Sequence, residues 1–381
     1  MADDVFPSSD HILFRDSLRA FVDKEVCPVA DALDEKESFP TVQFQRLAEL
    51  GYFGVRYPAE YGGSGGDNMM YSIMCEELAR GWLSLAAAVA AHTSLGTMPI
   101  LRNGSSEQKQ RYLTAAIRGE KIAGLALSEP GAGSDVASLR TTAVRQGDHY
   151  VLNGSKTFTT NGPVADFIVV AAKTNPDAGI KGISLFVIEK GTPGFIKGRK
   201  LKKLGTWASE TGELFFEECR VPKESLLGEE GRGFINLMQT LTEGRVMTAS
   251  LAIGIARAAL EASIAYAKER IQFGQTISKF QGMQFRLAEM ATELEAARHL
   301  TYYAARLSEK NVPYGKEASM AKMFASEVAN RITSEASIVF GGYGYMMEYP
   351  VQRYFRDARF LLYGEGTSDI QKMIIARELG L

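Results

Sequence analysis

Apolar positions in the first 120 residues recur at helical spacing. The pattern predicts a first helix that ends near Pro28 and a second helix that is closed by Gly51. Residues 71–91 are rich in Ala, Leu and Met and carry few charges, which predicts a buried helix. We therefore expect residues 1–120 to form an N-terminal helical domain. The apolar positions of the first two helices are Phe14, Leu18, Phe21 and Val22, then Phe44, Leu47, Ala48 and Leu50.

The pattern changes near Lys121. Short runs of β-branched and aromatic residues appear at 150–152, 167–170, 183–188 and 214–216, separated by stretches containing Gly, Pro, Asn and Thr. Short apolar runs bounded by turn-forming residues are typical of strands. Residues 121–228 are therefore predicted to form a middle, β-barrel-like domain.

Helical spacing returns from Phe234 onward and is sustained over long stretches. Apolar residues recur along 251–259, 283–297, 320–332 and 370–379, and the second of these stretches approaches heptad spacing. Long helices with apolar stripes indicate a four-helix bundle, which we assign to residues 229–381. The order helical, β, helical places the chain in the α+β class.

Composition limits the classes of partner. The chain has 381 residues and a formal net charge of −2, a balance that argues against nucleic acid or an anionic membrane as the main partner. We find no apolar run approaching the roughly 20 residues needed to cross a bilayer, and no signal or transit peptide. Cys27, Cys75 and Cys219 show no CxxC spacing, so we expect reduced thiols of a cytoplasmic protein and no metal site.

The most informative stretch is 356–371, which is centred on one carboxylate. Gly364 and Gly366 interrupt the helical pattern and free the backbone at Glu365, which then lies on a tight joint between two helices. Thr367 or Ser368 can cap the following helix, and the 368–371 spacing fits a capping box. The preceding apolar residues raise the pKa of Glu365 and the following helix N-terminus lowers it, which suits a general base. The alternative is an ordinary solvated glutamate in a turn.

Two further segments carry clustered donors at the start of the β domain. Residues 127–135 form a turn with hydroxyls and glycines, and residues 158–162 add Thr159, Thr160 and Asn161. Backbone N–H and hydroxyl groups of this kind suit a flavin ring edge and a pyrophosphate, although a purely structural turn explains the same residues. The chain has no Rossmann fingerprint, so any dinucleotide must be held in another way.

Four segments occur together in a specific order along the chain. They are 128–135, 270–274, 340–344 and 356–371, and with them the chain resembles the acyl-CoA dehydrogenase flavoprotein family over essentially its whole length. The resemblance implies an acyl-CoA dehydrogenase-like fold, an FAD cofactor and α,β-dehydrogenation of an acyl-CoA to the trans-2-enoyl-CoA. Electrons would then pass to an electron-transferring flavoprotein.

The same resemblance assigns roles at the reacting carbons. Glu365 matches the catalytic base, which takes the α-proton, while the β-hydrogen leaves as hydride to flavin N5. The Glu365 backbone N–H and the flavin ribityl 2′-hydroxyl polarise the thioester carbonyl, as an oxyanion hole does.

The resemblance also implies contacts for the cofactor and the substrate. Arg270, Gln281 and the Gly341-Gly342 turn match residues that reach the FAD of a neighbouring subunit, so we expect a homo-oligomer, a tetramer with D2 symmetry. Substrate contacts are expected at Ser134, Thr242, Arg245 and Gly366. All positions that match FAD contacts are Leu125, Leu127, Ser128, Gly133, Ser134, Phe158, Thr160, Arg270, Gln272, Phe273, Phe280, Gln281, Ile338, Gly341, Gly342, Thr367 and Asp369.

The chain departs from the family pattern at several positions. Phe158 stands where the family usually has Trp, Ile338 where a Gln often contacts FAD, and Trp207 where an Arg is common. Gly364 replaces a Tyr that often precedes the base. Its loss either widens the acyl cavity, which would favour branched or cyclic substrates, or is compensated by a neighbouring side chain, which would keep a preference for straight chains.

A second possible base position lies on the first bundle helix. Some branches of the family carry the base there, but this chain has Gly244 at that position, which leaves Glu365 as the matching base. The adjacent Glu243 is expected to point away, about 100° round the helix. The competing functions are a flavin-dependent oxidase or monooxygenase on the same fold and a non-catalytic scaffold that keeps the flavin. An intact Glu365 loop argues against both.

Overall fold

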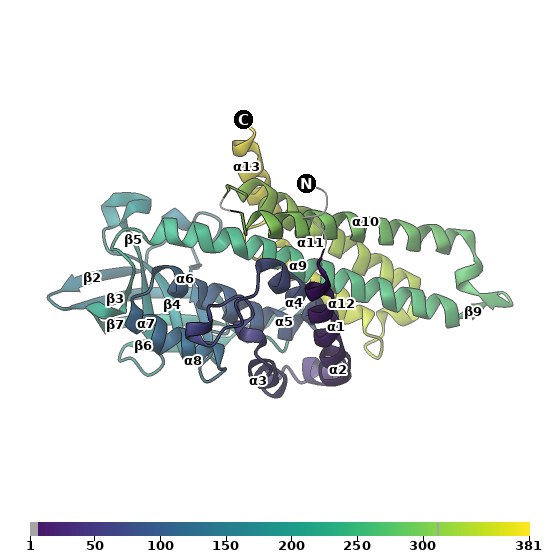
Figure 1. Ribbon diagram of the computed structural model, residues 1–381, viewed down its shortest axis with the longest axis horizontal. Helices are drawn as coiled ribbons and strands as arrows, with labels where there is room; N and C mark the ends of the chain where they lie inside the picture. Colours follow the sequence, from purple (N-terminus) through teal and green to yellow (C-terminus); the bar gives the residue numbers. More distant parts are fainter. Residues whose placement is uncertain (1–6, 311) are drawn as a thin grey trace.

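The computed structural model describes residues 7–310 and 312–381. The molecule is elongated, with the β domain at one end and the long C-terminal helices running along the longest axis (Figure 1). Helices occupy the chain as far as Ile117, the strands of the β domain lie between Ala123 and Leu227, and long helices follow from Gly233. The predicted order of helical, β and helical parts is confirmed.

The N-terminal helices differ from the expected ones at two places. The chain does not leave the helix at Pro28: a π-helical turn, Val22–Val26, leads directly into the next helix, and Pro28 lies in its first turn, where the missing N–H is tolerated. The run 71–91 is divided at Trp82, whose extended backbone separates two helices. The helices are α1 Ser9–Phe21, α2 Cys27–Glu35, α3 Thr41–Glu49, α4 Asn68–Gly81, α5 Leu83–Ala90, α6 Met98–Asn103, α7 Ser106–Gln108 and α8 Thr114–Ile117.

The middle domain is built on one mixed sheet in the order β6-β7-β3-β2-β4-β5-β8, with β1 paired in parallel to β4. The long strands β3 and β7 are antiparallel, and their register shifts between Lys156 and Thr159. This irregularity re-aims Phe158, as bulges commonly do beside functional sites. The strands are β1 Ala123–Ala126, β2 Thr142–Gln146, β3 His149–Thr160, β4 Phe167–Lys173, β5 Ile183–Glu189, β6 Phe195–Lys200, β7 Thr211–Pro222 and β8 Leu226–Leu227.

The C-terminal part consists of three long helices and two short ones. The long helices α9, α10 and α11 run along the molecule, and α12 and α13 pack against α11 (Figure 1). A small hairpin, β9 Ile271–Gln272 and β10 Gln275–Thr276, joins α9 to α10 at the end opposite the β domain. The helices are α9 Gly233–Glu269, α10 Gln281–Leu307, α11 Gly315–Val339, α12 Val351–Ala358 and α13 Ser368–Glu378.

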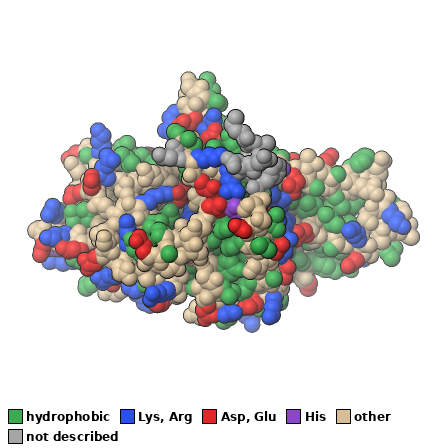
Figure 2. Space-filling view, in the orientation of Figure 1, with side chains coloured by type: hydrophobic (Ala, Val, Ile, Leu, Met, Phe, Trp, Pro, Cys, Tyr) green, Lys and Arg blue, Asp and Glu red, His purple; other side chains and the backbone are tan. Residues whose placement is uncertain are grey.

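The N-terminal helices and the bundle share one hydrophobic core. Leu18 of α1, Trp82 and residues of α9, α10 and α11 belong to the same buried cluster, while separate clusters cover the β domain. Leu83–Asn103 and Gly233–Glu269 are long and apolar enough to cross a membrane, so our expectation that no run approaches that length was wrong. However, 94% and 78% of their most apolar windows are buried inside the protein, as in core helices. Acidic and basic side chains both occur across the face shown in Figure 2.

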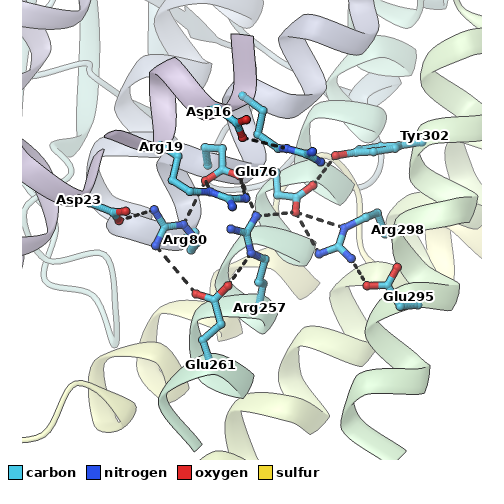
Figure 3. Close-up of polar contacts among 12 residues, drawn as sticks. Asp16, Arg19, Asp23, Glu76, Arg80, Arg257, Glu261, Glu295, Arg298 and Tyr302 are labelled. Carbon is cyan, nitrogen blue, oxygen red and sulfur yellow. Dashed lines mark hydrogen bonds and ion pairs between the residues drawn. The ribbon is translucent and has the colours of Figure 1, made fainter. Parts of the chain in front are cut away.

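A buried ion-pair cluster ties α1 and α4 to the bundle (Figure 3). Its centre is the pair Glu76 and Glu77 on α4, whose side chains are 2% and 0% exposed. Glu77 accepts hydrogen bonds from Arg19 and Arg257 at 2.9 and 2.7 Å. Glu76 accepts one from the Tyr302 hydroxyl at 2.6 Å. The remaining hydrogen bonds to the two carboxylates come from Arg80, to Glu77, and from Arg298 and Arg257, to Glu76.

Candidate active site

Glu365 lies on a strained joint between two helical segments. It follows the 3₁₀ turn Arg359–Leu362, and its φ of +56° is unusual for a residue with a side chain. Gly366 has a φ of +92°, which glycine adopts freely. The glycine-flanked joint predicted from the sequence is therefore present, and its left-handed backbone includes the glutamate itself.

The helix that follows Glu365 is capped differently from the expected capping box. Thr367 is the N-cap of α13, and its side chain accepts a hydrogen bond from the Ile370 N–H at 3.4 Å. The Gln371 amide does not complete a box with Ser368. Its Nε2 donates instead to the Glu365 and Gly366 carbonyls, both at 3.0 Å, because this buried amide needs acceptors nearby.

A buried lysine holds the same loop through hydrogen bonds to its carbonyls. Lys322 of α11 is fully buried, and its Nζ donates to the Gly366 carbonyl at 2.6 Å and to the Leu362 carbonyl at 3.4 Å. Together with Gln371 it holds carbonyls on both sides of Glu365. Among the described residues, the Glu365 backbone N–H makes no hydrogen bond. The loop therefore has fixed carbonyls and an N–H available to a ligand.

The Glu365 carboxyl group is enclosed but incompletely satisfied. Its Oε2 is buried and has no hydrogen-bond partner in the part of the chain that the structure describes. Burial raises its pKa from 4.5 to about 7, and the cations Arg245 and Lys322 oppose this rise. The sequence predicted that apolar surroundings raise this pKa. The opposing charges come from α9 and α11.

The first bundle helix packs directly against this carboxyl group. A Cβ added at Gly244 would lie 2.4 Å from the Glu365 Oε2 and 3.0 Å from its Cδ. The neighbouring Glu243 is directed elsewhere, because it pairs with Arg56 at 3.4 Å and with Arg102. This agrees with the expected rotation round α9. With the carboxyl group in this position, any side chain at position 244 would force it to move.

Arg245 brings a buried positive charge to the same site. It is 7% exposed, its Nη1 donates to the Thr242 hydroxyl at 3.3 Å, and its Nε has no partner among the described residues. Burial lowers its pKa, and Glu365 partly restores it. An enclosed guanidinium with an open donor suits an anionic or carbonyl group of a ligand.

The position before the base is occupied by a neighbouring ring. A Cβ added at Gly364 would lie 3.0 Å from Cε2 of Phe360, one helical turn earlier in the chain. The glycine has no positive φ, so its backbone does not demand glycine. Of the two possibilities raised by the loss of a tyrosine here, the contact favours compensation by a neighbour. The sequence did not identify Phe360 as that neighbour.

The predicted flavin loops meet at one edge of the β domain. The Thr157 N–H donates to the Ser128 carbonyl at 2.9 Å, which joins the loop after β1 to the irregular end of β3. Buried Lys156, missed by the sequence analysis, holds this loop through Glu129 at 2.7 Å and the Leu127 carbonyl at 3.1 Å. Phe158 has a φ of +56° and a side chain that is 70% exposed. Leu125, Gly133, Ser134 and Thr160 lie on the same strands and loops.

Thr367 and Asp369 lie at the start of α13, directly after Glu365. The other remaining predicted cofactor residues lie at the end of the molecule away from the β domain. The β9–β10 hairpin and the turn after α11 come together there, because Arg270 stacks on the Tyr343 ring at 5.4 Å and Phe273 meets Phe280 at 6.2 Å. Phe273 is 94% exposed and Ile338 is 57% exposed. Gln272, Gln281, Gly341 and Gly342 belong to the same surface. Figure 1 shows this hairpin far from the β domain.

Family models match almost the whole chain. The acyl-CoA dehydrogenase N-terminal domain matches residues 8–120, the middle domain residues 124–219 and the C-terminal domain residues 231–380. The chain belongs to the acyl-CoA dehydrogenase family. It is therefore an oxidoreductase that acts on the CH–CH group of an acyl-CoA, with FAD as its cofactor.

Individual relatives resemble the chain over nearly its full length. A short-chain specific acyl-CoA dehydrogenase of Clostridium acetobutylicum is 45% identical over 367 residues, which cover 96% of this chain and 97% of the relative. The butyryl-CoA dehydrogenase structure from Megasphaera elsdenii has a TM-score of 0.96, is 40% identical and covers 99% of each chain. A structure described as the electron transferring flavoprotein of Acidaminococcus fermentans contains a chain with a TM-score of 0.97, 44% identity and 98% coverage of each.

The β-domain edge fits the FAD of this family. An exposed aromatic ring at a strand irregularity offers a flat apolar surface. Half-buried Thr160 lies two residues further along β3, and half-buried Ser128 lies on the loop that hydrogen-bonds to Thr157. Across residues 7–310 and 312–381, no group of His, Cys, Asp and Glu is placed to hold a metal ion.

Proposed function

We propose that this acyl-CoA dehydrogenase oxidises short straight-chain acyl-CoAs and uses Glu365 as the α-proton base. The observation that carries the assignment of the base is the buried Oε2 of Glu365, which lacks a partner although cations flank the loop. The named relatives support a short acyl chain, and the Phe360 ring against Gly364 supports a site that has not been widened.

The chain contributes a base and a hydrogen-bond donor to the reaction. The ionised Glu365 carboxylate takes the α-proton of the thioester, and its free backbone N–H donates to the thioester carbonyl, which makes the α-carbon more acidic. The FAD, when bound, accepts the hydride that leaves the β-carbon. Because Glu365 acts as the anion, its raised pKa predicts that activity falls as the pH drops below about 7.

The acceptor of the electrons is an electron-transferring flavoprotein in this proposal. Support comes from the similar chain in the Acidaminococcus fermentans structure that carries that description. The free thiols Cys27, Cys75 and Cys219 support a reducing, cytoplasmic location.

The separation of the two cofactor-contact sets supports a homo-oligomer. The β9–β10 hairpin lies far from the β domain, whose strand β3 carries Phe158 (Figure 1), so we infer that one chain does not bring both to a single FAD. A second copy, with its hairpin at the first copy's β domain, would complete the site and cover exposed Phe273 and Ile338. We expect a tetramer with D2 symmetry. A flavin-loaded, active monomer in sedimentation at micromolar concentration would refute this assembly.

The test of the function is anaerobic reduction of the bound flavin by acyl-CoAs. We expect butyryl-CoA to bleach the wild-type flavin faster than isobutyryl-CoA or a cyclic acyl-CoA. Glu365→Gln should keep FAD and substrate binding but lose at least about 10²–10⁴-fold in the rate of bleaching. Bleaching at the wild-type rate in this variant would move the base elsewhere. Rapid peroxide formation in air by the substrate-reduced enzyme would instead indicate an oxidase.

A further inference from the structure

Two buried lysines each hydrogen-bond to one of the two loops of the proposed active site, but their charges are compensated differently. Lys156, under the Ser128 loop, pairs with the Glu129 carboxylate at 2.7 Å. Lys322, under the Glu365 loop, donates to the carbonyls of Leu362 and Gly366, and no carboxylate of the described residues hydrogen-bonds to its ammonium. A fully buried ammonium without a carboxylate partner is costly, so its position calls for a compensating interaction.

The compensating charge is Glu365. Burial lowers the pKa of Lys322 to about 8, and the negative charge of Glu365 is the strongest influence that opposes this fall. The effect is mutual, because Lys322 in turn lowers the pKa of Glu365. Two other charged groups act on Lys322 directly, Arg245 of α9 and Glu327 of α11. Arg245 is in turn influenced by Tyr314, which precedes α11, and by Arg377 of α13.

Hydrogen bonds connect the same lysine to the shape of the loop. Its two carbonyl acceptors lie on either side of Glu365 in sequence, and Gln371 holds the Glu365 carbonyl itself. With these carbonyls held, a left-handed Glu365 keeps its N–H unpaired. Strained backbone of this kind persists only where its surroundings fix it.

We propose that Lys322 is a positioning residue for the proposed base: its buried ammonium fixes the Glu365 loop through the Leu362 and Gly366 carbonyls and supplies a positive charge that favours the ionised carboxylate. The proposal rests on the proposed function, since it assumes that Glu365 is the base. Lys322 touches neither substrate nor cofactor in this role. It acts on the reaction through the charge and orientation of another residue.

The test is the pH profile of flavin reduction in variants at position 322. Lys322→Met removes the charge and both hydrogen bonds in a similar volume. Lys322→Gln removes the charge but keeps an amide donor for the Gly366 carbonyl. This variant replaces Lys322→Met in the test if the methionine variant loses FAD or does not fold. Lys322→Arg keeps the charge. Lys316→Met, in the partly exposed first turn of the same helix, is the matched control.

In the Met and Gln variants we expect the acidic limb of the pH profile of kcat/KM to shift to higher pH by about one unit. The reason is that an opposite charge nearby typically lowers a carboxyl pKa by about 1–3 units, and these variants remove that charge. The loss should be roughly tenfold at pH 6 and much smaller at pH 9, since more Glu365 ionises as the pH rises. Lys322→Arg should keep the limb near the wild-type pH, and Lys316→Met should leave it unchanged.

A purely structural role for Lys322 predicts a different result. It would lower activity equally at all pH values and leave the limb in place. An unmoved limb in the Met or Gln variant would overturn the proposal, as would an equal shift in the Arg variant. Glu365→Gln separates this failure from failure of the proposed function. If Glu365→Gln abolishes flavin reduction while the Lys322 variants keep the wild-type limb, only the role of Lys322 is lost.

Discussion

Glu77 in the α4 cluster and Glu365, the proposed base, are both enclosed glutamates, and both have arginines nearby. Burial raises the pKa of each carboxyl group. For Glu77 the hydrogen-bonded Arg19 and Arg257 outweigh burial and bring the pKa down to about 2. For Glu365 the cations act at longer range and the pKa stays at about 7. The difference lies in the hydrogen bonds, because an Oε2 without a partner cannot be stabilised as an anion to the same extent.

The comparison separates a structural carboxylate from a chemically available one. Every donor around Glu77 is committed to holding α1, α4 and α9 together (Figure 3). Glu365 keeps an oxygen and a backbone N–H unpaired within the described chain. A proton acceptor must be able to gain a proton near the working pH, and only the second environment allows this.

The largest effect is expected from breaking the structural carboxylate. Glu77→Gln leaves buried arginine charges without their partner, so we expect a loss of about 3–5 kcal/mol in the free energy of unfolding at pH 7. Urea denaturation measures it, with Glu213→Gln as a control at an exposed ion pair. A loss below about 1 kcal/mol would mean that the cluster behaves like a surface pair.

A smaller effect of opposite sign is expected at Glu365. The folded-state pKa of Glu365 is raised from 4.5 to about 7, so its favourable contribution is complete below pH 4.5 and is lost as the pH rises through 7. Glu365→Gln should therefore stabilise the protein by on the order of 1–2 kcal/mol at pH 8, and by almost nothing at pH 4.5. Equal stabilisation at both pH values would show that the ionised carboxylate is not the cause.

Crowding the carboxyl group tests its placement. A Cβ at position 244 would lie 2.4 Å from the Glu365 Oε2, so Gly244→Ala must displace the base. We expect kcat/KM to fall by roughly 10–100-fold, since small misplacements of a catalytic group have effects of this size. Gly315→Ala is the control, because no atom of the described residues lies within 4 Å of its added Cβ. An active Gly244→Ala enzyme would mean that the carboxyl group rotates freely.

The smallest effect is expected on the apolar side of the base. In Gly364→Ala the new Cβ would contact Phe360 at 3.0 Å, and the ring can yield by a few tenths of an ångström. We expect a change of about threefold or less in kcat/KM for butyryl-CoA. Gly364→Tyr should cost more, and Phe360→Leu in the same chain should recover part of the loss. A much greater loss on branched than on straight acyl-CoAs would revive the idea of a widened pocket.

The sequence was informative where local chemistry decides the structure. Glycines flanking Glu365 predicted the interrupted helix, and short β-rich runs predicted the middle domain. Local rules misled where two of them compete. Pro28 can end a helix or begin one, and here it lies in the first turn of α2. Ser368 and Gln371 have the spacing of a capping box, but Gln371 is drawn to buried carbonyls instead.

The supports of the site could not be read from the sequence, because they are tertiary. Lys322 lies in a helical run of small and apolar residues, and its acceptors, the carbonyls of Leu362 and Gly366, are 40 or more positions away. Phe360 fills the space beside Gly364 only once the 3₁₀ turn has formed. A lone charged residue on an otherwise apolar helix face was the one available signal for Lys322.

The separation of the β domain from the β9–β10 hairpin has a genetic consequence (Figure 1). In the proposed assembly, one chain that lacks the base and another that lacks the hairpin arginine are each inactive alone. In a mixed pair, one of the two sites combines Glu365 from the chain with the altered arginine and Arg270 from the chain with the altered base. That site has both residues intact. Co-expression of Glu365→Gln with Arg270→Ala should therefore restore activity that neither variant has, so that the two alleles complement one another.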